Sequence, residues 1–318
     1  MTFPLDDLLE KTSRTFALAI PLLPTPAREA VGLAYLLFRV ADTFEDAARW
    51  PREARLDALE QLAEVLELEG PEQHRAASVL VRRAAERPPV DHEGYLELLG
   101  ALPGLLEEVA RLPEPVRAVV LRHTLRTTEG MARVVTRTDE RGNLALATRA
   151  ELRDYCYVVA GIVGELLTEL FLVLTPSLSD QGAALRAEMV AFGEGLQLVN
   201  ILKDADGDAV EGRVFLPAAM PRADVFALAR ADLEAGERYV SALQRGGAPE
   251  GYLAFTGLSL ALAWRAIDGL ERHGAGHKVS RDDVGRIFES LQGVLERGEP
   301  VSPRVIAGPP LPLGRGLG

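Results

Sequence analysis

The segment from Arg149 to Leu174 constrains the fold of this chain most, because its helical wheel is apolar on almost every side. A helix of this kind must be covered by neighbours all round, so the segment predicts a buried, central helix. The small residues Ala160, Gly161 and Gly164 leave space there for a close neighbour or a bulky ligand. The apolar side chains of the segment are Tyr155, Val158, Val159, Ile162, Val163, Leu166, Leu167, Phe171 and Leu172.

The rest of the chain also carries apolar residues at helical spacing, and no run alternates as a half-buried strand does. The pattern therefore predicts an all-α fold. One helix is expected to start at Thr25-Pro26 and to end near Trp50, and the next to run from Pro51 to about Glu69. Further helices are expected at residues 72–86, 91–111, 113–138, 149–174, 180–207, 222–246, 249–272 and 281–297.

A single domain is favoured over residues 1–298, because no internal Gly/Pro/Ser-rich linker divides the 318 residues. Hydrophobic residues make up 47% of the chain and charged residues 26%, which supports a large core and argues against disorder. Residues 299–318 form a Pro/Gly-rich tail, which we expect to be extended or mobile and to have no catalytic role.

The net charge of −12 argues against nucleic acid as a partner, since nothing in the sequence resembles a basic stripe. A metal ion and a few placed arginines could still bind an anionic substrate such as a diphosphate.

A cytoplasmic protein is the expectation from the cysteine content and the apolar segments. Cys156 is the single cysteine, so an internal disulfide is excluded and a reducing compartment fits. The first residues lack the basic region of a signal peptide. The nearly uncharged stretch 252–264 is too short to span a membrane, and two glutamates interrupt the other apolar region. We expect no transmembrane helix; peripheral membrane contact and the oligomeric state stay open.

The first of two acidic clusters, Asp42, Glu45 and Asp46, lies at helical spacing and is expected to converge on one face. An apolar stripe from Val31 to Phe38 leads to Asp42 and Asp46, so these acids are predicted to point inward. A buried, unpaired carboxylate costs on the order of several kcal/mol unless a metal or cationic ligand compensates it. A solvated acidic face, the common alternative, would need polar neighbours.

The second cluster, Asn200, Asp204 and Asp208, also shares one helical face, over two turns. Two sets of oxygen donors suit Mg²⁺ that is bridged by a diphosphate. Cationic side chains lie near both clusters and could contact phosphate oxygens, although each alone could equally belong to a surface ion pair. They are Arg39, Lys203, Arg213 and Arg14, the last between the hydroxyls of Ser13 and Thr15.

Four blocks of this sequence resemble, in order and at similar separations, the signatures of the squalene and phytoene synthase family. They are Ser13–Phe16, Tyr35–Asp46, Tyr155–Gly164 and Leu196–Pro217, and the likeness covers roughly residues 8–290. The resemblance implies an all-α class I isoprenoid synthase fold. In that fold two acidic helices face each other across a central cavity and hold Mg²⁺ against a prenyl diphosphate.

The resemblance also implies roles for individual residues. The metal and diphosphate ligands would be Asp42, Asp46, Asn200, Asp204 and Asp208, with Glu45 beside them. The phosphate-contacting cations would be Arg14, Arg39, Lys203 and Arg213, and Tyr155 would be the cavity tyrosine. Ser13, Thr15, Phe16 and Gln197 lie in the same blocks and are candidate substrate contacts. The family usually has arginine at Lys203 and glutamate at Gly207, so diphosphate geometry is less certain here than metal binding.

The implied activity is a head-to-head condensation of two prenyl diphosphates through a cyclopropyl diphosphate, with Tyr155 or the released diphosphate handling the lost proton. The first acidic block looks more like the squalene branch, which implies farnesyl diphosphate as substrate and NADPH for the final reduction. No NADPH site can be located in the sequence. The alternatives are a phytoene or dehydrosqualene synthase, a synthase that stops at the cyclopropyl (presqualene) diphosphate, and an inactive family member that acts as a scaffold. Tyr155 could also be an ordinary core tyrosine.

Overall fold

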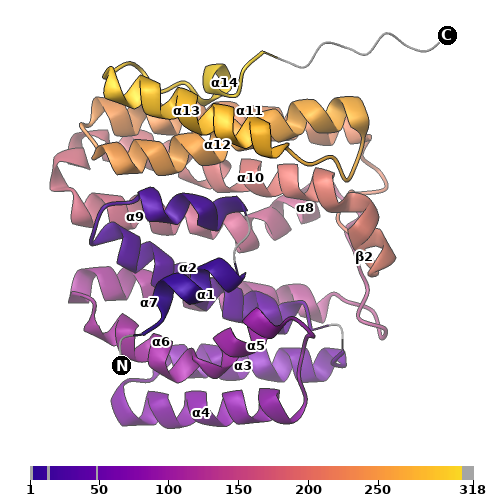
Figure 1. The fold of residues 1–318 in the computed structure, drawn as a ribbon. Coiled ribbons are helices and arrows are strands. Elements are labelled where there is room, and N and C mark those ends of the chain that lie inside the picture. The colour runs from indigo at the N-terminus through magenta and orange to yellow at the C-terminus, as the bar shows by residue number, and fades with distance from the viewer. Residues whose placement is uncertain (1–2, 13–14, 48, 310–318) are drawn as a thin grey trace. The chain divides into compact units, whose positions relative to one another are not determined.

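The structure is a computed structural model that describes residues 3–12, 15–47 and 49–309. Helices dominate these residues, which confirms the all-α prediction (Figure 1). The α-helices are α1 (Leu5–Thr12), α2 (Ala27–Glu45), α3 (Arg52–Glu67), α4 (Gly70–Glu86), α5 (Glu93–Gly100), α6 (Leu102–Arg111), α7 (Glu114–Thr136), α8 (Arg149–Cys156), α9 (Ile162–Leu174), α10 (Gly182–Val210), α11 (Arg222–Arg245), α12 (Glu250–His273), α13 (Arg281–Glu296) and α14 (Pro303–Ile306). The remaining elements are 3₁₀ helices at Thr15–Leu22 and Pro176–Gln181, a π-helical turn at Tyr157–Gly161, and the paired strands β1 (Leu144–Ala145) and β2 (Arg213–Val214).

The chain folds into two compact units. Unit 1 contains the residues up to Pro21, then Thr25–Leu144 and Glu169–Leu174. Its central element is α2, which contacts α1, α3, α5, α6 and α7. Alanine, valine and leucine side chains on nearly all sides of α2 are buried, including Val31 and Phe38 of the predicted stripe. The carboxyl end of α2 carries the first acidic cluster.

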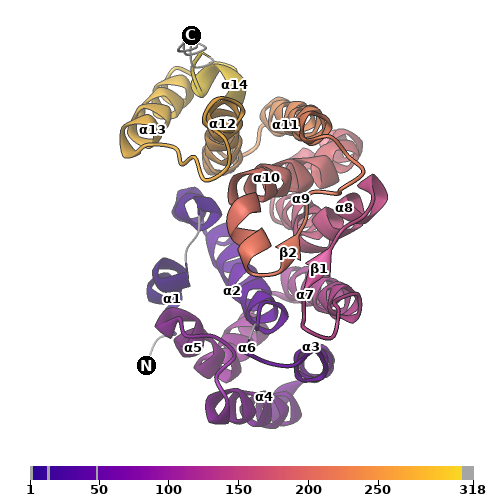
Figure 2. The same cartoon turned by 90° about the vertical axis from the view of Figure 1, so that its right-hand side faces the viewer.

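Unit 2 contains Leu22–Pro24, Ala145–Thr168 and the residues from Thr175 onward. Its long helix α10 contacts α8, the π-helical turn, α11, α12 and β2. Helix α12 lies beside α13 and α14, as the two views show (Figures 1 and 2). The carboxyl end of α10 carries the second acidic set.

The apolar segment predicted as one central helix is instead α8, the π-helical turn and α9. Its small residues serve a close helix neighbour, which was one of the two predicted uses. A Cβ atom on Gly164 would lie 1.9 Å from the carbonyl oxygen of Met189, and one on Gly193 would lie 2.0 Å from that of Ala160. The backbones of α10 and of this segment therefore touch at positions where only glycine fits.

Several predicted boundaries were wrong. Helix α2 ends at Glu45, five residues before the predicted end at Trp50. At this end the N–H of Asp46 donates a hydrogen bond to the carbonyl of Asp42 at 2.8 Å. The helix predicted at 91–111 is two helices, α5 and α6, because Pro103 has no N–H to continue the backbone ladder. The strands were not expected either.

The tail also differs from the expectation up to its last described residue, 309. Val301 and Ile306 are buried, and Glu237 accepts hydrogen bonds from the backbone N–H of Arg304 and the hydroxyl of Ser302. These hydrogen bonds tie the segment to Glu237 of α11, and α14 also contacts α12 and α13. Residues 310–318, the rest of the predicted tail, lie outside the described residues.

Two helical stretches among the described residues, 149–174 and 250–273, are long and apolar enough to cross a membrane by length and composition. The apolar windows are half and fully buried inside the protein, respectively. Core helices pass the same test, so the finding is weak evidence for a membrane span.

Candidate functional site

The acidic end of α2 contains a half-buried ion pair. Arg39 Nη1 donates a hydrogen bond to Asp42 Oδ2 at 2.8 Å, and the Asp42 side chain is 31% exposed. The guanidinium of Arg39 lies over the rings of Tyr35 and Tyr95, at 5.8 and 5.5 Å from their centroids. Burial alone would lower the pKa of Arg39, but the charge of Asp42 and the two tyrosines raise it. Arg39 is therefore a permanent cation next to Asp42.

Glu45 does not share the environment of Asp42 and Asp46, although the sequence predicted that the three converge. Its side chain is buried in unit 1, where Oε1 lies 4.0 Å from Arg55 Nη2. Arg55 also donates a hydrogen bond to the Glu45 carbonyl. Asp42 and Asp46 are only partly buried, because they lie on the part of the last turn that the core does not cover. Glu45 is thus positioned as a core ion-pair partner, which leaves Asp42 and Asp46 as the accessible acids of this cluster.

The second set lies on the last turns of α10, which continues to Val210, past the predicted end. Lys203 Nζ donates to Asn200 Oδ1 at 3.1 Å and lies 3.4 Å from Asp204 Oδ2. The structure therefore places Lys203 beside Asn200 and Asp204, as predicted for a cation near this acidic set.

The side chain of Arg213, the first residue of β2, lies beside the end of α10 because a tight turn reverses the chain. Gly212 has a φ of 80°, a conformation that favours glycine, and it reverses the chain between α10 and β2. Arg213 Nη2 consequently lies 3.6 Å from Asp208 Oδ1. It also pairs with Glu211 at 2.5 Å, so its cation is shared between two carboxylates.

Tyr155 is 7% exposed, and its ring stacks on that of Phe215 with centroids 4.5 Å apart. Phe215 directly follows β2, so the same turn that places Arg213 also supplies the stacking partner of Tyr155. The sequence did not reveal this contact. Tyr155 is a packed side chain within unit 2, which is compatible with both the core and the catalytic interpretation.

The remaining candidates are less defined. Gln197 lies on α10 and is partly exposed. Thr15 and Phe16 lie in the first 3₁₀ helix, and nothing is described of their side chains. Ser13 and Arg14 lie outside the described residues, so their predicted roles stay predictions.

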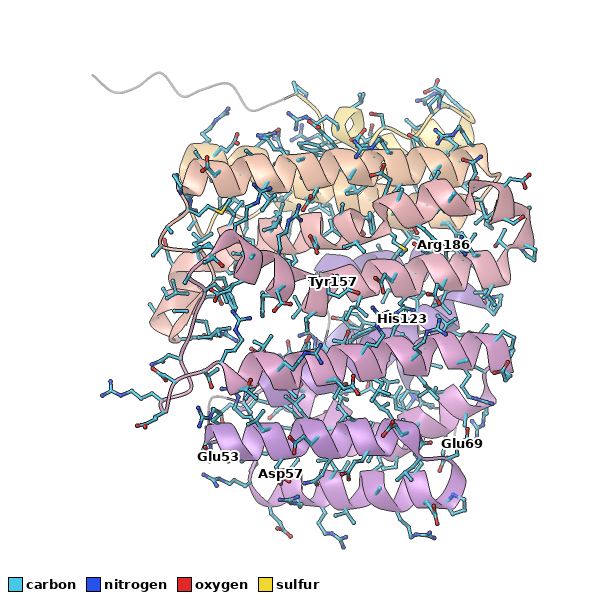
Figure 3. The ribbon with its side chains drawn as sticks, turned by 180° about the vertical axis from the view of Figure 1, so that it is seen from behind. Glu53, Asp57, Glu69, His123, Tyr157 and Arg186 are labelled. Atoms are coloured by element: carbon cyan, nitrogen blue, oxygen red, sulfur yellow. The ribbon has the colours of Figure 1, made fainter. Side chains whose placement is uncertain are left out.

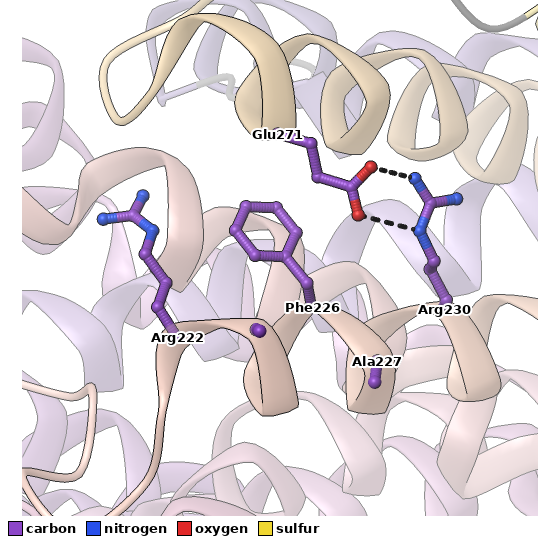
Figure 4. Close-up of a pocket in the computed structure, with 6 residues that line it drawn as sticks. Arg222, Phe226, Ala227, Arg230 and Glu271 are labelled. Carbon is purple, nitrogen blue, oxygen red and sulfur yellow. Dashed lines mark hydrogen bonds and ion pairs between the residues drawn. The ribbon is translucent and has the colours of Figure 1, made fainter.

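Within residues 3–12, 15–47 and 49–309, no three His, Cys, Asp or Glu side chains are grouped so as to hold a metal ion by themselves. Two cavities among the described residues, of about 430 and 510 Å³, are lined by residues other than the candidates. One of about 430 Å³ is lined by Arg222, Phe226, Arg230 and Glu271 of α11 and α12 (Figure 4). Arg222 there donates to the Leu202 carbonyl, and Arg230 pairs with Glu271.

Sequence reasoning missed two groups of residues that contact α2 and α10. Tyr95 reaches Arg39 from α5. A buried ion network joins Arg153 of α8 to Glu194 of α10 and Asp232 of α11. Their partners are far apart in the sequence, so helical spacing offers no signal for either group.

Comparison with known proteins gives a consistent picture. The family described as squalene/phytoene synthase matches residues 9–245. Squalene synthase of Schizosaccharomyces pombe is 32% identical over 211 residues, which cover 66% of this chain and 43% of that protein. Squalene synthase ERG9 of Saccharomyces cerevisiae is 31% identical over 212 residues, which cover 66% and 44%. The aligned region thus spans under half the length of these curated relatives.

Solved structures share the fold. A structure of TcSQS with the ligand BPH1237 superposes with a TM-score of 0.69 at 23% identity, covering 92% of this chain and 89% of that one. A dehydrosqualene synthase in complex with a ligand gives a TM-score of 0.55 at 20% identity, covering 92% and 95%. The predicted class I isoprenoid synthase fold is thereby confirmed.

Proposed function

Because this chain belongs to the squalene/phytoene synthase family, we propose that it catalyses the head-to-head condensation of two prenyl diphosphates through a cyclopropyl diphosphate to squalene. The observation that carries the proposal is the chemistry of the two acidic helix ends. In each, accessible carboxylates lie next to fixed cations: Arg39 with Asp42 on α2, and Lys203 with Asp204 on α10. Carboxylates alone would repel a diphosphate, whereas this mixture suits a metal–diphosphate complex.

The donor set fits Mg²⁺. Asp42, Asp46, Asn200, Asp204 and Asp208 offer only oxygen atoms, which hard divalent cations prefer. Mg²⁺ commonly uses one or two carboxylates together with substrate phosphates, so three protein acids in one group are not required. When bound, the metal would neutralise charge that develops on the leaving diphosphate.

The cations of the chain would act on substrate diphosphate. Arg39 is held by Tyr35, Tyr95 and Asp42 and can present its guanidinium without reorganising. Lys203 and Arg213 would bind phosphate oxygens beside the α10 acids, and Arg14 would add a guanidinium from the N-terminal block.

Ionisation of the allylic C–O bond would then give a cation that the double bond of the second substrate attacks. Loss of a proton closes the cyclopropane ring. The released diphosphate would accept that proton directly, or the Tyr155 hydroxyl would take it and pass its own proton to the diphosphate. Farnesyl diphosphate is the proposed substrate, and NADPH would supply the hydride for reduction to squalene.

Product analysis tests the proposal directly. We expect mass spectrometry to detect squalene after incubation with farnesyl diphosphate, Mg²⁺ and NADPH, and the cyclopropyl diphosphate when NADPH is omitted. EDTA should abolish both products and Mg²⁺ should restore them. If the product is phytoene from geranylgeranyl diphosphate, or dehydrosqualene, the protein is a phytoene or dehydrosqualene synthase instead. Absence of any condensation product would favour the inactive scaffold.

Lys203→Ala is expected to weaken binding of farnesyl diphosphate by about tenfold. The change removes an ammonium group proposed to bind phosphate, which also contacts Asn200 and Asp204. Lys203→Arg keeps the charge and adds a planar fork, so binding should change by less than about threefold. Equilibrium binding in the presence of Mg²⁺ measures both variants. If Lys203→Ala binds as tightly as the wild type, the side chain does not contact phosphate.

Tyr155→Phe should slow condensation strongly and lower the melting temperature little. The ring and its stack on Phe215 are kept, and only the hydroxyl is removed. Rate and melting temperature are measured on the same sample. A variant that melts several degrees lower but condenses at the normal rate would make Tyr155 a core residue, and diphosphate alone would then accept the proton.

A further inference from the structure

An ion network that contains two buried carboxylates and the partly exposed Arg153 joins three helices of unit 2. Arg153 of α8 makes a bidentate contact with Asp232 of α11. Its Nη1 donates a hydrogen bond to Oδ2, and its Nη2 donates one to Oδ1 at 2.9 Å. The same Nη1 also donates to Glu194 Oε2 of α10. The Glu194 and Asp232 side chains are only 8% and 6% exposed.

Stability alone does not account for this network. Two buried carboxylates share one guanidinium, and burial raises the pKa of Glu194 to about 6 against the opposing effect of Arg153. The ionised form of Glu194 is therefore costly in its surroundings. Networks of this kind are weak sources of stability, but their bidentate geometry fixes how the joined elements are oriented.

The network is placed to set the rotation of α8 about its own axis. This helix has eight residues, starts at a Thr148 capping box and ends in the π-helical turn that begins at Tyr157, labelled in Figure 3. Arg153 and Tyr155 are two positions apart, so their side chains leave α8 on nearly opposite sides. Holding Arg153 against α10 and α11 consequently directs Tyr155 toward Phe215.

The other end of the network belongs to the helix that carries the second acidic set. Glu194 lies on α10 ahead of Asn200 and Asp204. At the following residue, a Cβ on Gly195 would lie 3.1 Å from the Asp232 backbone, so α10 and α11 are also in close contact there. One guanidinium thus connects the helix of Tyr155 to the helix of the proposed diphosphate ligands.

We propose that Arg153, Glu194 and Asp232 are positioning residues that hold Tyr155 in register with the α10 ligands during condensation. The inference rests on the proposed function. None of the three side chains contacts the substrate in this role; they act through the orientation of α8.

The test compares Arg153→Lys with Arg238→Lys. Arg238 makes an equivalent fork from α11 to Glu188 of α10, with both bonds at 2.9 Å, but its side chain is 59% exposed. Both changes keep the charge and lose the fork. Assays at pH 8 keep Glu194 ionised, since its pKa is about 6.

We expect Arg153→Lys to lower kcat at least about tenfold while KM changes by less than about threefold, because a small displacement of a reacting group slows chemistry more than binding. The share of prenyl alcohol among the products should rise several-fold, as water captures an allylic cation whose partner reaction is slowed. Arg238→Lys should leave both quantities unchanged. Asp232→Asn, which keeps an oxygen acceptor, is expected to behave like Arg153→Lys.

The product ratio separates positioning from general damage, because it does not depend on the fraction of protein that is folded. Arg153→Lys and Asp232→Asn variants that lose kcat only in proportion to their folded fraction, with the wild-type product ratio, would overturn the positioning role. Equal effects of Arg238→Lys would overturn it too. A wild-type protein that makes no condensation product defeats the proposed function itself, so the two failures are distinct.

Discussion

Replacing Asp42 or Asp204 with asparagine is expected to lower turnover of farnesyl diphosphate at least about a hundredfold while the protein stays folded. Each change removes one negative charge that would hold metal against the leaving diphosphate. The amide that replaces Asp42 can still accept the Arg39 hydrogen bond, and the Asp204 side chain is 42% exposed, so neither site should lose much stability. Turnover at saturating Mg²⁺ and thermal melting measure the two effects.

Asp206→Asn is the matched control, because Asp206 lies on the same helix as Asp204 but outside the predicted ligand face and is exposed. It should keep wild-type turnover. Near-normal activity of both Asp42→Asn and Asp204→Asn would contradict the metal assignment.

Gly164→Ala and Gly193→Ala are expected to give the largest losses of stability, more than about 3 kcal/mol each. The added methyl group would lie 1.9 Å from the Met189 carbonyl oxygen in the first case and 2.0 Å from the Ala160 oxygen in the second. Backbone atoms cannot rotate away as a side chain can, so the two helical segments would have to separate. Chemical denaturation measures the free energy of unfolding.

Gly207→Ala provides the control on α10 itself. A Cβ there meets nothing within 4 Å, so the change should stabilise the protein by roughly 0.5 to 1 kcal/mol through helix propensity. If Gly164→Ala has the free energy of unfolding of the wild type, α9 and α10 do not lie in backbone contact at this position.

The candidate site was only partly predictable. Lys203, predicted as a cation beside the second acidic set, does contact Asn200 and Asp204, because residues three apart on one helix meet whatever surrounds them. The predicted convergence of Asn200, Asp204 and Asp208 stays a prediction. The same rule misplaced Glu45, since its partner Arg55 belongs to another helix. Local spacing specifies which face a side chain occupies, but not what packs against that face.

The sequence by itself determined the all-α fold and the helical positions of the acids on α2 and α10, because these depend on residue type and short-range periodicity. It also indicated the family, through the resemblance of four ordered blocks. Only the tertiary structure decided the π-helical turn after α8, the stack of Tyr155 on Phe215 and the Arg153 network. The stack and the network join residues from different parts of the chain, and the π-helical turn packs against α10. Such contacts form when helices are brought together by the burial of their apolar faces. Periodicity predicts that burial but does not specify which helices meet.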